Sequence, residues 1–435
     1  MRILVHGINY APELTGIGKY SSEMCAWLAG RGHEVRVITA PPYYPEWQIR
    51  KGYRKYAYSR EVIDGVRVDR CPLWIPRRLS GAKRILHLAS FALSCLPLML
   101  RAVRWRPHII ITIEPAFFCA PASWLTARLA GSTAWLHVQD LEIDAAFELG
   151  MLPPALRKFV TYLERTVICR FDGISTISKA MRGRLVHKGI DENRCHLFGN
   201  WANCRTIHPL PRPSAYRQTL ELPEGAFVAL YSGNMGEKQG LEIIIDMARA
   251  LLDKPDIYFV MCGDGAVRHR LESLAGGLSN MRWLPLQPVE RLNELLNLAD
   301  VHLLPQRANA ADLVMPSKLT GMLASGKPVI ATAISGTELA AVAGEGGLVV
   351  PPGDMSAFMS ALLQLRGDVT LCAQKGAQAR SFAERHFAVD EVLEQFEATI
   401  QRSVNRRTSF SRRVIEKSTV LPDPVIEKVG DRADH

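Results

Sequence analysis

A repeated order of short apolar strand, turn and amphipathic helix constrains this chain more than any other feature. The stretch RILVHGI is followed by a glycine-containing turn and then by GKYSSEMCAWLAG, in which Tyr20, Met24, Trp27 and Leu28 lie along one helical face. The next apolar run, HEVRVITA, completes a strand–helix–strand unit. Such units build parallel sheets that helices cover on both faces, so the sequence predicts an α/β fold.

The same order occurs twice along the chain, with a break between the two copies. The strands PHIIITIE, STAWLHVQD and DGISTIS continue the first copy. The segment NWANCRTIHPLPRPSAY, around residues 200–216, is rich in proline and has no periodicity. The order then restarts with AFVALYSG, IYFVMCGDG, MRWLPL, VHLLPQ, KPVIATA and GGLVVP. We therefore expect two tandem Rossmann-like, doubly wound parallel-sheet domains with a cleft between them.

The chain length of 435 residues suits this division, because a single domain seldom exceeds about 250–300 residues. We place the first domain at residues 1–200, a linker at 201–216 and the second domain at 217–380. Residues 381–403 are typical of one or two terminal helices. Residues 404–435 are polar and aperiodic, which predicts a mobile tail.

Positive charge is concentrated at the start of the chain. Residues 1–106 hold 18 Lys and Arg against 7 Asp and Glu, whereas the remaining 35 basic and 36 acidic residues nearly cancel. Such a field suits an anionic membrane or an acidic ligand. The sequence has no helix-turn-helix, zinc-finger or RNA-recognition signature, so we do not expect a nucleic-acid partner.

The nine cysteines are scattered and form no CxxC pair. This spacing indicates reduced cytosolic thiols rather than zinc ligands or disulfides. The N-terminus reads as a strand rather than as a signal peptide, which predicts a cytoplasmic protein.

The apolar stretch ILHLASFALSCLPLML at residues 85–100 is flanked by basic residues on both sides. A membrane span needs about 20 residues, so this stretch is short for one. Two interpretations remain open: a buried helix that leads into the next strand, or a helix that lies in the membrane interface with its basic flanks on lipid headgroups. Both hold if one face of the helix packs inward.

Three strand-to-helix turns are suited to binding phosphate. Glycine or a cation occurs in each: PELTGIGKY at residues 12–20, YSGNMGEKQG at 231–240, and the helix start at Ser317 and Lys318. Backbone N–H groups at a helix start attract anions, and lysines supply charge. A tight turn that needs glycine, or a solvated lysine, explains each motif equally well when it is taken alone. Lys238 and Lys318 converge only if the second domain folds as predicted.

A cluster of polar groups follows a strand of the first domain, in WLHVQDLEIDAAFELG. Its members are His137, Gln139, Asp140, Glu142 and Asp144. A general base or a ligand for sugar hydroxyls would come from such a cluster, although a single His or Asp at a strand end is more often structural. No acidic pair is placed to hold a divalent ion, so we expect no metal and no cofactor.

These motifs in their order resemble the GT-B glycosyltransferases of the large retaining family four, over nearly all of residues 1–400. The stretches that carry the resemblance are RILVHGINYAPELTGIGKYSSEMCAWLAGRGHEVRVITAPPYYP, HVQDLEIDAAFELGML, FDGISTISKAM, YSGNMGEKQGLEIII, MCGDGAVRHRLE and MPSKLTGMLASGKPVIAT. The first two are also similar to the glycosyltransferases of colanic acid biosynthesis.

The resemblance implies a role for individual residues. Lys238 and Lys318 would bind the donor diphosphate, and Asp140, with His137 and Gln139, would form the catalytic acceptor side of the cleft. Further donor contacts would come from the glycine loops and the helix start, at Gly16, Gly18, Gly233, Asn234 and Ser317. Leu286 and Gln287, in RWLPLQP, would hold the nucleoside base.

The chain also departs from the family pattern. Met235 stands close to the place where the family often carries an arginine. The E-x7-E pattern is absent, because Leu313 and Gly321 occupy its two positions. Asp312, one residue from the first position, is a candidate substitute. Ribose recognition would then come from the backbone or from Glu338.

We therefore expect an enzyme that moves a sugar, by our guess fucose from GDP-fucose, with retention of configuration. The resemblance implies a polyprenyl-diphosphate-linked acceptor at the inner face of the cytoplasmic membrane, with the enzyme held there peripherally. The alternative is a non-catalytic scaffold that binds nucleotide or lipid in a polysaccharide assembly complex. A third interpretation is a nucleotide-sugar epimerase on the same fold.

Overall fold

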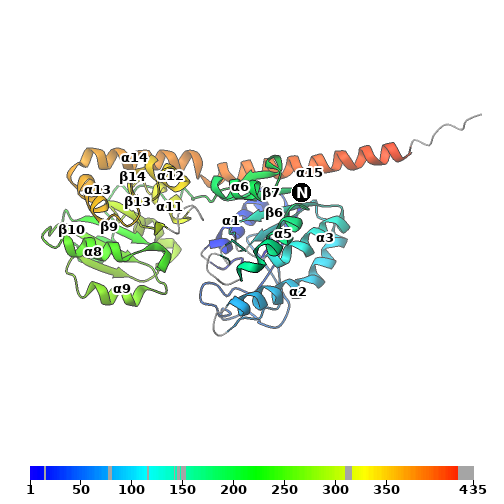
Figure 1. Cartoon of the computed structure of the whole chain (residues 1–435), viewed down its shortest axis with the longest axis horizontal. Helices are drawn as coiled ribbons and strands as arrows, with labels where there is room; N and C mark the ends of the chain where they lie inside the picture. Colours follow the sequence, from blue (N-terminus) through cyan, green and yellow to red (C-terminus); the bar gives the residue numbers. More distant parts are fainter. Residues whose placement is uncertain are drawn as a thin grey trace, which may run out of the picture.

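The computed structural model describes residues 1–13, 16–76, 81–114, 117–141, 143–144, 147, 153–308 and 316–419. They form two α/β domains that lie side by side, as Figure 1 shows. Two tandem parallel-sheet domains are the architecture predicted from the repeated strand–helix order.

The first domain contains an eight-stranded sheet in the order β3-β4-β2-β1-β5-β6-β7-β8. Neighbouring strands are parallel except for the β3–β4 pair. The strands are β1 (Arg2–His6), β2 (Glu34–Thr39), β3 (Ser59–Ile63), β4 (Val66–Arg70), β5 (Ile109–Glu114), β6 (Thr133–Val138), β7 (Gly173–Thr176) and β8 (Cys195–Leu197).

Helices cover both faces of this sheet. They are α1 (Gly16–Gly30), α2 (Gly81–Trp105), η1 (Phe117–Cys119), α3 (Ala120–Ala130), η2 (Pro154–Leu156), α5 (Arg157–Ile168), α6 (Lys179–His187), η3 (Glu192–Arg194) and α15 (Val389–Thr419). One core cluster includes buried side chains of α2, α3, α5 and α6, and the other includes those of α1 and α15. Strands β1 and β5 are buried on both faces, which is why they read as continuous apolar runs.

The second domain contains a six-stranded sheet, parallel throughout, in the order β11-β10-β9-β12-β13-β14. Its strands are β9 (Phe227–Ser232), β10 (Ile257–Cys262), β11 (Met281–Leu284), β12 (Val301–Leu304), β13 (Val329–Thr332) and β14 (Gly347–Val350). Its helices are α7 (Tyr216–Thr219), η4 (Glu237–Gln239), α8 (Glu242–Ala250), α9 (Arg268–Ala275), η5 (Val289–Arg291), α10 (Leu292–Leu296), α11 (Lys318–Ala324), α12 (Glu338–Glu345), α13 (Met355–Gly367) and α14 (Val369–His386).

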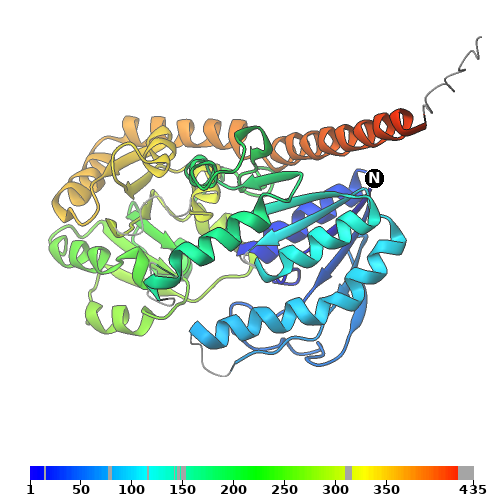
Figure 2. The ribbon, with the colours of Figure 1, turned by 45° about the vertical axis from the view of Figure 1, so that its right-hand side comes forward.

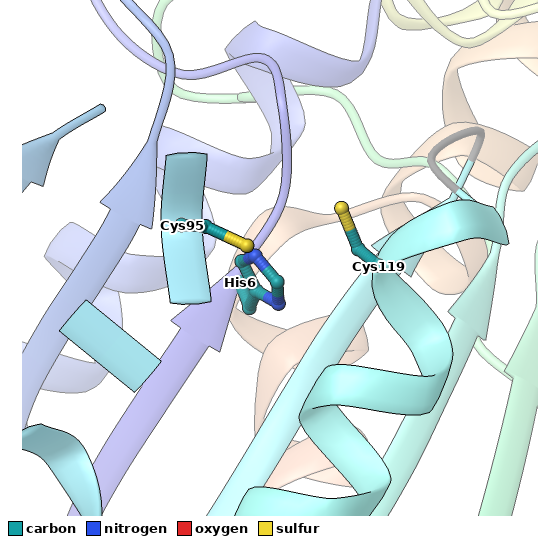
Figure 3. A group of neighbouring side chains, drawn as sticks. All are labelled: His6, Cys95 and Cys119. Carbon is teal, nitrogen blue, oxygen red and sulfur yellow. The ribbon is translucent and has the colours of Figure 1, made fainter. Parts of the chain in front are cut away.

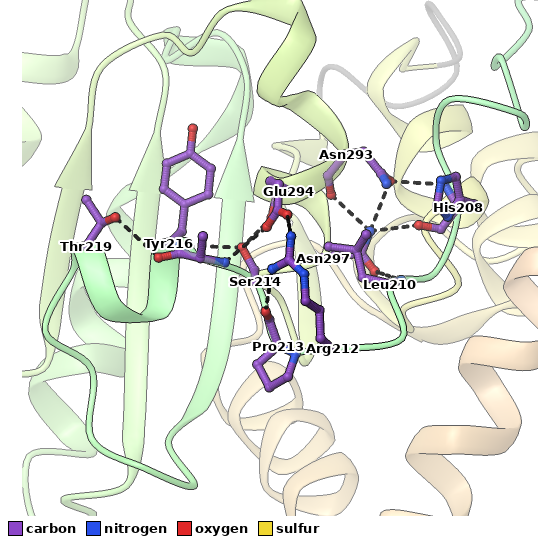
Figure 4. A network of polar contacts seen from close by, with 11 residues as sticks. His208, Leu210, Arg212, Pro213, Ser214, Tyr216, Thr219, Asn293, Glu294 and Asn297 are labelled. Carbon is purple, nitrogen blue, oxygen red and sulfur yellow. Dashed lines mark hydrogen bonds and ion pairs between the residues drawn. The ribbon is translucent and has the colours of Figure 1, made fainter.

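Most of the segment predicted to be a linker is bound to the second domain. The backbone N–H groups of His208 and Leu210 donate to the side-chain oxygens of Asn293 and Asn297, at 3.0 and 2.9 Å. Glu294 accepts from Arg212 at 2.6 Å. Figure 4 shows this network between the extended segment and α10. The chain therefore leaves the first domain close to Trp201 rather than through a free connection over residues 201–216.

The chain returns to the first domain at its C-terminal end. Ala388 pairs with Ala202 in an isolated bridge between α14 and α15. Helix α15 then packs on the first domain, as Figure 2 shows from a second side. It extends to Thr419, so the predicted polar tail from residue 404 is wrong for its first part. Val404 is buried and Arg407 forms an ion pair with Asp172, so contacts of α15 with the first domain reach as far as Arg407.

The apolar stretch at residues 85–100 lies within α2. Phe91, Cys95 and Met99 are buried against the sheet, whereas Leu93 and Leu100 are exposed. By length and composition alone, Lys83–Trp105 could cross a membrane, but 33% of that apolar window is buried inside the protein. The interpretation that one face of this helix packs inward is therefore confirmed.

Candidate donor and acceptor site

Two glycine turns of the second domain pack backbone against backbone at the carboxyl edge of its sheet. The N–H group of Gly233 donates to the Cys262 carbonyl at 2.9 Å, and that of Met235 donates to the Asp264 carbonyl at 2.8 Å. A Cβ atom on Gly263, whose φ is +138°, would overlap the Gly233 carbonyl oxygen. The close approach of the two turns therefore requires glycine.

Lys318, the first residue of α11, extends beneath the first of these turns. Its Cδ lies 3.3 Å from where a Cβ on Gly233 would be, and its Nζ lies 4.0 Å from the ring centroid of Tyr231. Among the described residues, this buried Nζ has no hydrogen-bond partner. Burial lowers the pKa of Lys318 to about 7. A buried ammonium without a partner is costly, so this position favours an anionic ligand.

Asp140 of the first domain and Lys238 of the second domain interact electrostatically. Asp140 follows β6 in the first domain, and Lys238 belongs to η4 in the second. Burial raises the pKa of Asp140, while the positive charges of Lys238 and of Arg84 on α2 act in the opposite direction. The Asp140 carboxyl thus lies within electrostatic range of a lysine of the second domain, and its acceptor role stays a prediction. Arg84 was not predicted as a site residue, because it is far from any strand end in the sequence.

His137 does not share this position. It lies on β6 on the same face as Trp135, because side chains alternate along a strand. Its Nδ1 is 3.0 Å from Ser175 Oγ and its ring packs on Phe198. Burial lowers the pKa of His137 to about 3, so its imidazole is neutral. The prediction that His137 lines the cleft is wrong, because the ring faces the interior of the first domain.

The rest of the predicted polar cluster is divided. Gln139 is buried beside Asp140 in the sequence. Asp144 forms an ion pair with Lys188 at 2.9 Å, and Glu164 binds the same lysine at 2.8 Å. Asp144 is thus a structural partner, and Glu142 lies outside the described residues.

The glycine loop of the first domain is built around a buried carboxylate that the sequence did not single out. Glu13 accepts the N–H groups of Tyr43 and Tyr44, both at 3.0 Å. A Cβ on Gly18 would lie 2.8 Å from the Glu13 side chain. Gly18 is therefore required for packing against Glu13, whereas Gly16 is open to its surroundings, with no atom near its Cβ position. Donor contacts by these two glycines stay a prediction.

Helices α1 and α11 meet between the domains. The buried Tyr20 hydroxyl contacts those of Thr320 and Ser317, and the Tyr20 ring packs edge-on against Trp201, with centroids 5.0 Å apart. The predicted donor residue Ser317 is thus engaged with the first domain. Glu338 likewise accepts the N–H group of Ala180 in α6 at 3.0 Å, which leaves its ribose role untested.

Gly321 faces apolar side chains. A Cβ at this position would lie 3.5 Å from Leu296 Cδ1 and 3.8 Å from Ile207 Cδ1. The Cβ atom of a glutamate at this position would therefore contact two apolar side chains. Asp312 and Leu313, the other residues of the altered family pattern, lie outside the described residues.

The predicted base-binding residues lie beyond β11, at the edge of the second sheet. Leu286 is 61% exposed. Gln287 accepts from the Tyr216 hydroxyl at 2.7 Å and donates to the Pro285 carbonyl at 2.8 Å. Its side chain therefore ties α7 to the strand end, and contact with a base stays a prediction, as does the role of Asn234, whose carbonyl accepts from Tyr231.

Comparison with known proteins decides what this arrangement belongs to. Residues 15–201 match the glycosyl transferase 4-like domain, and residues 226–368 match the glycosyl transferases group 1. WcaI of Escherichia coli K12, named for glycosyl transfer in colanic acid biosynthesis, is 42% identical over 407 residues, which cover 91% of this chain and 98% of WcaI. This chain belongs to that family of GT-B glycosyltransferases.

Solved structures with low identity share the glycosyltransferase fold. Sucrose-phosphate synthase from Thermosynechococcus elongatus has a TM-score of 0.72 and 17% identity, with 92% of this chain and 99% of that chain covered. Anabaena HepE, solved with UDP and glucose, has a TM-score of 0.67 and 14% identity, with 92% and 100% covered. The glycosyltransferase therefore has both the sequence and the architecture of its family.

Proposed function

We propose that this glycosyltransferase moves a hexose from a nucleoside-diphosphate sugar to a polyprenyl-diphosphate-linked saccharide. The observation that carries the proposal is Lys318, whose Nζ is buried beneath the glycine turn with no hydrogen-bond partner among the described residues. A donor diphosphate at that turn would supply the missing anion. Solved HepE with UDP and glucose lends support, because a protein of the same fold binds such a ligand.

The reaction breaks the bond between the anomeric carbon of the sugar and the donor diphosphate. A bond from the anomeric carbon to the acceptor hydroxyl oxygen forms, and the hydroxyl proton passes to the departing diphosphate. Lys318 and Lys238 would stabilise the negative charge that grows on the diphosphate, as fixed charges in a dry site do most effectively. We assign no metal to this step and propose retention at the anomeric carbon, in line with the family resemblance.

Asp140 is placed to act on the acceptor side. Burial raises the pKa of its carboxyl and the charge of Lys238 acts on it, so we propose that it orients an acceptor hydroxyl close to the departing diphosphate. We propose that Asp140 binds the acceptor hydroxyl that attacks.

We propose the pathway from the relative and the donor from the family resemblance. WcaI is named for colanic acid biosynthesis, which supports a role in exopolysaccharide assembly. Fucose from GDP-fucose is our proposed donor. The proposed lipid-linked acceptor places the enzyme at the inner face of the cytoplasmic membrane.

The first experiment is a turnover assay with purified protein, a polyprenyl-diphosphate-sugar acceptor and a panel of GDP- and UDP-sugars, with products identified by mass. One donor should yield a sugar-extended lipid. Lys318→Met and Lys238→Ala should each lower kcat about 100-fold, the usual effect of removing one charge-stabilising group. Lys254→Ala is the matched control, because Lys254 pairs with the adjacent Asp253 at the surface.

Three results would contradict the proposal. Near-normal turnover in both lysine variants would remove their assigned role. If no donor in the panel yields a product while nucleotide binding is intact, the non-catalytic scaffold is favoured. Product from the donor without any acceptor would instead indicate an epimerase.

A further inference from the structure

Three residues from distant parts of the sequence bring metal-ligating atoms together in the first domain. His6 ends β1, Cys95 lies within α2, and Cys119 ends η1. One ligand atom from each lies within 4.8 Å of the other two, and all three side chains are buried. Figure 3 shows the Cys95 sulfur beside the His6 ring and the Cys119 sulfur across from it.

The histidine is held in an orientation that suits a ligand. His6 Nδ1 lies 2.7 Å from Ser123 Oγ, on the buried side of α3. When Nδ1 donates its proton to Ser123, Nε2 keeps a lone pair. Nε2 is buried and accepts or donates no hydrogen bond of ordinary geometry among the described residues. Buried nitrogens are rarely left in this state, so the position lacks a binding partner. Metal-bound histidines are commonly oriented in this way by a second hydrogen bond.

The two cysteines suit a thiophilic cation. The Cys95 and Cys119 side chains are buried, and their sulfurs lie within 4.8 Å of each other and of one His6 nitrogen. The thiolate is the form that binds metal ions. Two thiolates would cancel the charge of a divalent ion, which lets the complex be buried without net charge.

We propose that His6, Cys95 and Cys119 bind a zinc ion. Two sulfurs and one imidazole are ligands that zinc accepts, with its fourth position left to another small donor. The ion would join β1, α2 and the start of α3 at the carboxyl edge of the first sheet. The apolar helix α2 would then be fixed to the sheet by a metal as well as by packing. This inference is independent of the proposed transfer reaction.

The test uses the full chain, purified under reducing conditions and stripped of metal. Zinc is added, unbound metal is removed by gel filtration, and the zinc that remains on the protein is measured by elemental mass spectrometry. Co²⁺ titration then follows the sulfur-to-cobalt charge-transfer absorption, which reports thiolate ligation directly. We expect one metal ion per chain, and a melting temperature that rises when zinc is added.

Variants separate ligands from neighbours. Cys119→Ser should abolish most of the charge-transfer absorption. Ser123→Ala keeps all three ligands and should weaken metal affinity about 10–100-fold, since it frees the imidazole. Cys25→Ser is the matched control, because Cys25 is a buried thiol of the same domain outside the group, and it should bind metal normally.

The proposal is overturned if the wild-type chain takes up no zinc and shows no thiolate absorption with Co²⁺. A disulfide between Cys95 and Cys119 in the non-reduced, metal-free protein, together with failure to bind metal after reduction, would overturn it in favour of a redox pair. If Cys119→Ser does not fold, the wild-type cobalt spectrum and the Ser123→Ala titration still decide.

Discussion

The amino group of Lys318 is buried, so its protonation state depends on whether an anion is bound beside it. Its pKa of about 7 means that the group loses its proton near neutral pH in the absence of an anion. The sequence could suggest this lysine, because it stands at a helix start after a strand. It could not suggest the burial, which arises from the Tyr231 ring and the two glycine turns of another part of the domain.

We predict that nucleoside-diphosphate binding weakens as pH rises above about 7, the pKa of Lys318. The free chain loses a proton there, whereas a bound diphosphate favours the protonated lysine, so binding takes up a proton. Affinity should fall by up to about tenfold per pH unit above that value. Isothermal titration calorimetry of GDP binding, from about pH 6 to about pH 9, measures how the affinity changes with pH.

Lys318→Arg provides the control for this titration. An arginine keeps its charge throughout the range, so its slope should be flat even if its affinity is lower. Lys254→Ala should keep the wild-type slope. A flat wild-type profile would contradict the assigned position of Lys318 at the diphosphate.

Gly263 offers a second prediction at the level of one residue. Gly263→Ala should lower the stability of the second domain by about 2 kcal/mol or more, because its Cβ overlaps the Gly233 carbonyl and its φ of +138° is strained for alanine. Calorimetric melting measures the loss. Gly367→Ala, at a helical position with no atom near the added Cβ and no positive φ, should be neutral or slightly stabilising. Equal effects in the two variants would argue against the close packing of the turns.

Individual residues also show where sequence reasoning fails. The polar cluster after β6 was predicted as one site, but alternation along the strand turns His137 inward, and Lys188 binds Asp144. The three members of the zinc group are separated by dozens of residues, so no CxxC-type spacing marks them. The prediction of no zinc rested on that spacing and on the odd number of cysteines, and the metal measurement proposed above tests it.

At the level of elements, the strands that read as apolar runs were predicted, and the β3–β4 hairpin was not. A signal for the hairpin is present in EVIDGVRV, because Asp-Gly between alternating residues is typical of a tight β-turn. Asp64 and Gly65 both have positive φ, as such a turn requires. The hairpin adds the antiparallel edge of the first sheet.

Helix α2 carries a prediction of its own. Its outer face exposes Leu93 and Leu100, at 68% and 61%, on the basic first domain. We propose that this face binds anionic membranes. Leu93→Glu with Leu100→Glu should reduce sedimentation with phosphatidylglycerol vesicles by tenfold or more, because each buried leucine contributes about 1.5 kcal/mol or more.

The matched control for α2 lies in the second domain. Leu252 and Leu274 are 47% and 46% exposed, and their replacement by glutamate should leave vesicle binding unchanged. Equal loss in both double variants would show that added negative charge alone weakens binding. Failure of the wild-type chain to sediment at low salt would contradict membrane association.

The whole molecule is held together where the chain crosses between domains. It crosses near Trp201 and again near Ala388, and these two points are paired. The sequence suggested the first crossing through its prolines. It gave no sign of the second, because α14 and α15 read as one terminal segment and only the tertiary contacts assign them to different domains.

We predict that Phe396 of α15 stabilises the first domain. Its ring stacks on Phe198, with centroids 3.8 Å apart, and meets Trp135 edge-on. Phe396→Ala should cost about 3–5 kcal/mol and lower the melting temperature of the first domain by roughly 10 °C, measured by calorimetry. Gln395→Ala, at an exposed neighbouring position, should leave that transition in place. An unchanged transition in Phe396→Ala would mean that α15 is dispensable for the domain.

The return of α15 also sets the order in which the protein can be completed during synthesis. The ribosome makes the first domain first, yet one wall of that domain is encoded at the end of the chain. The second domain has all of its strands and helices before α15 is made, so it can close while the first still exposes Trp135 and Phe198. The first domain is therefore synthesised first but completes its folding last.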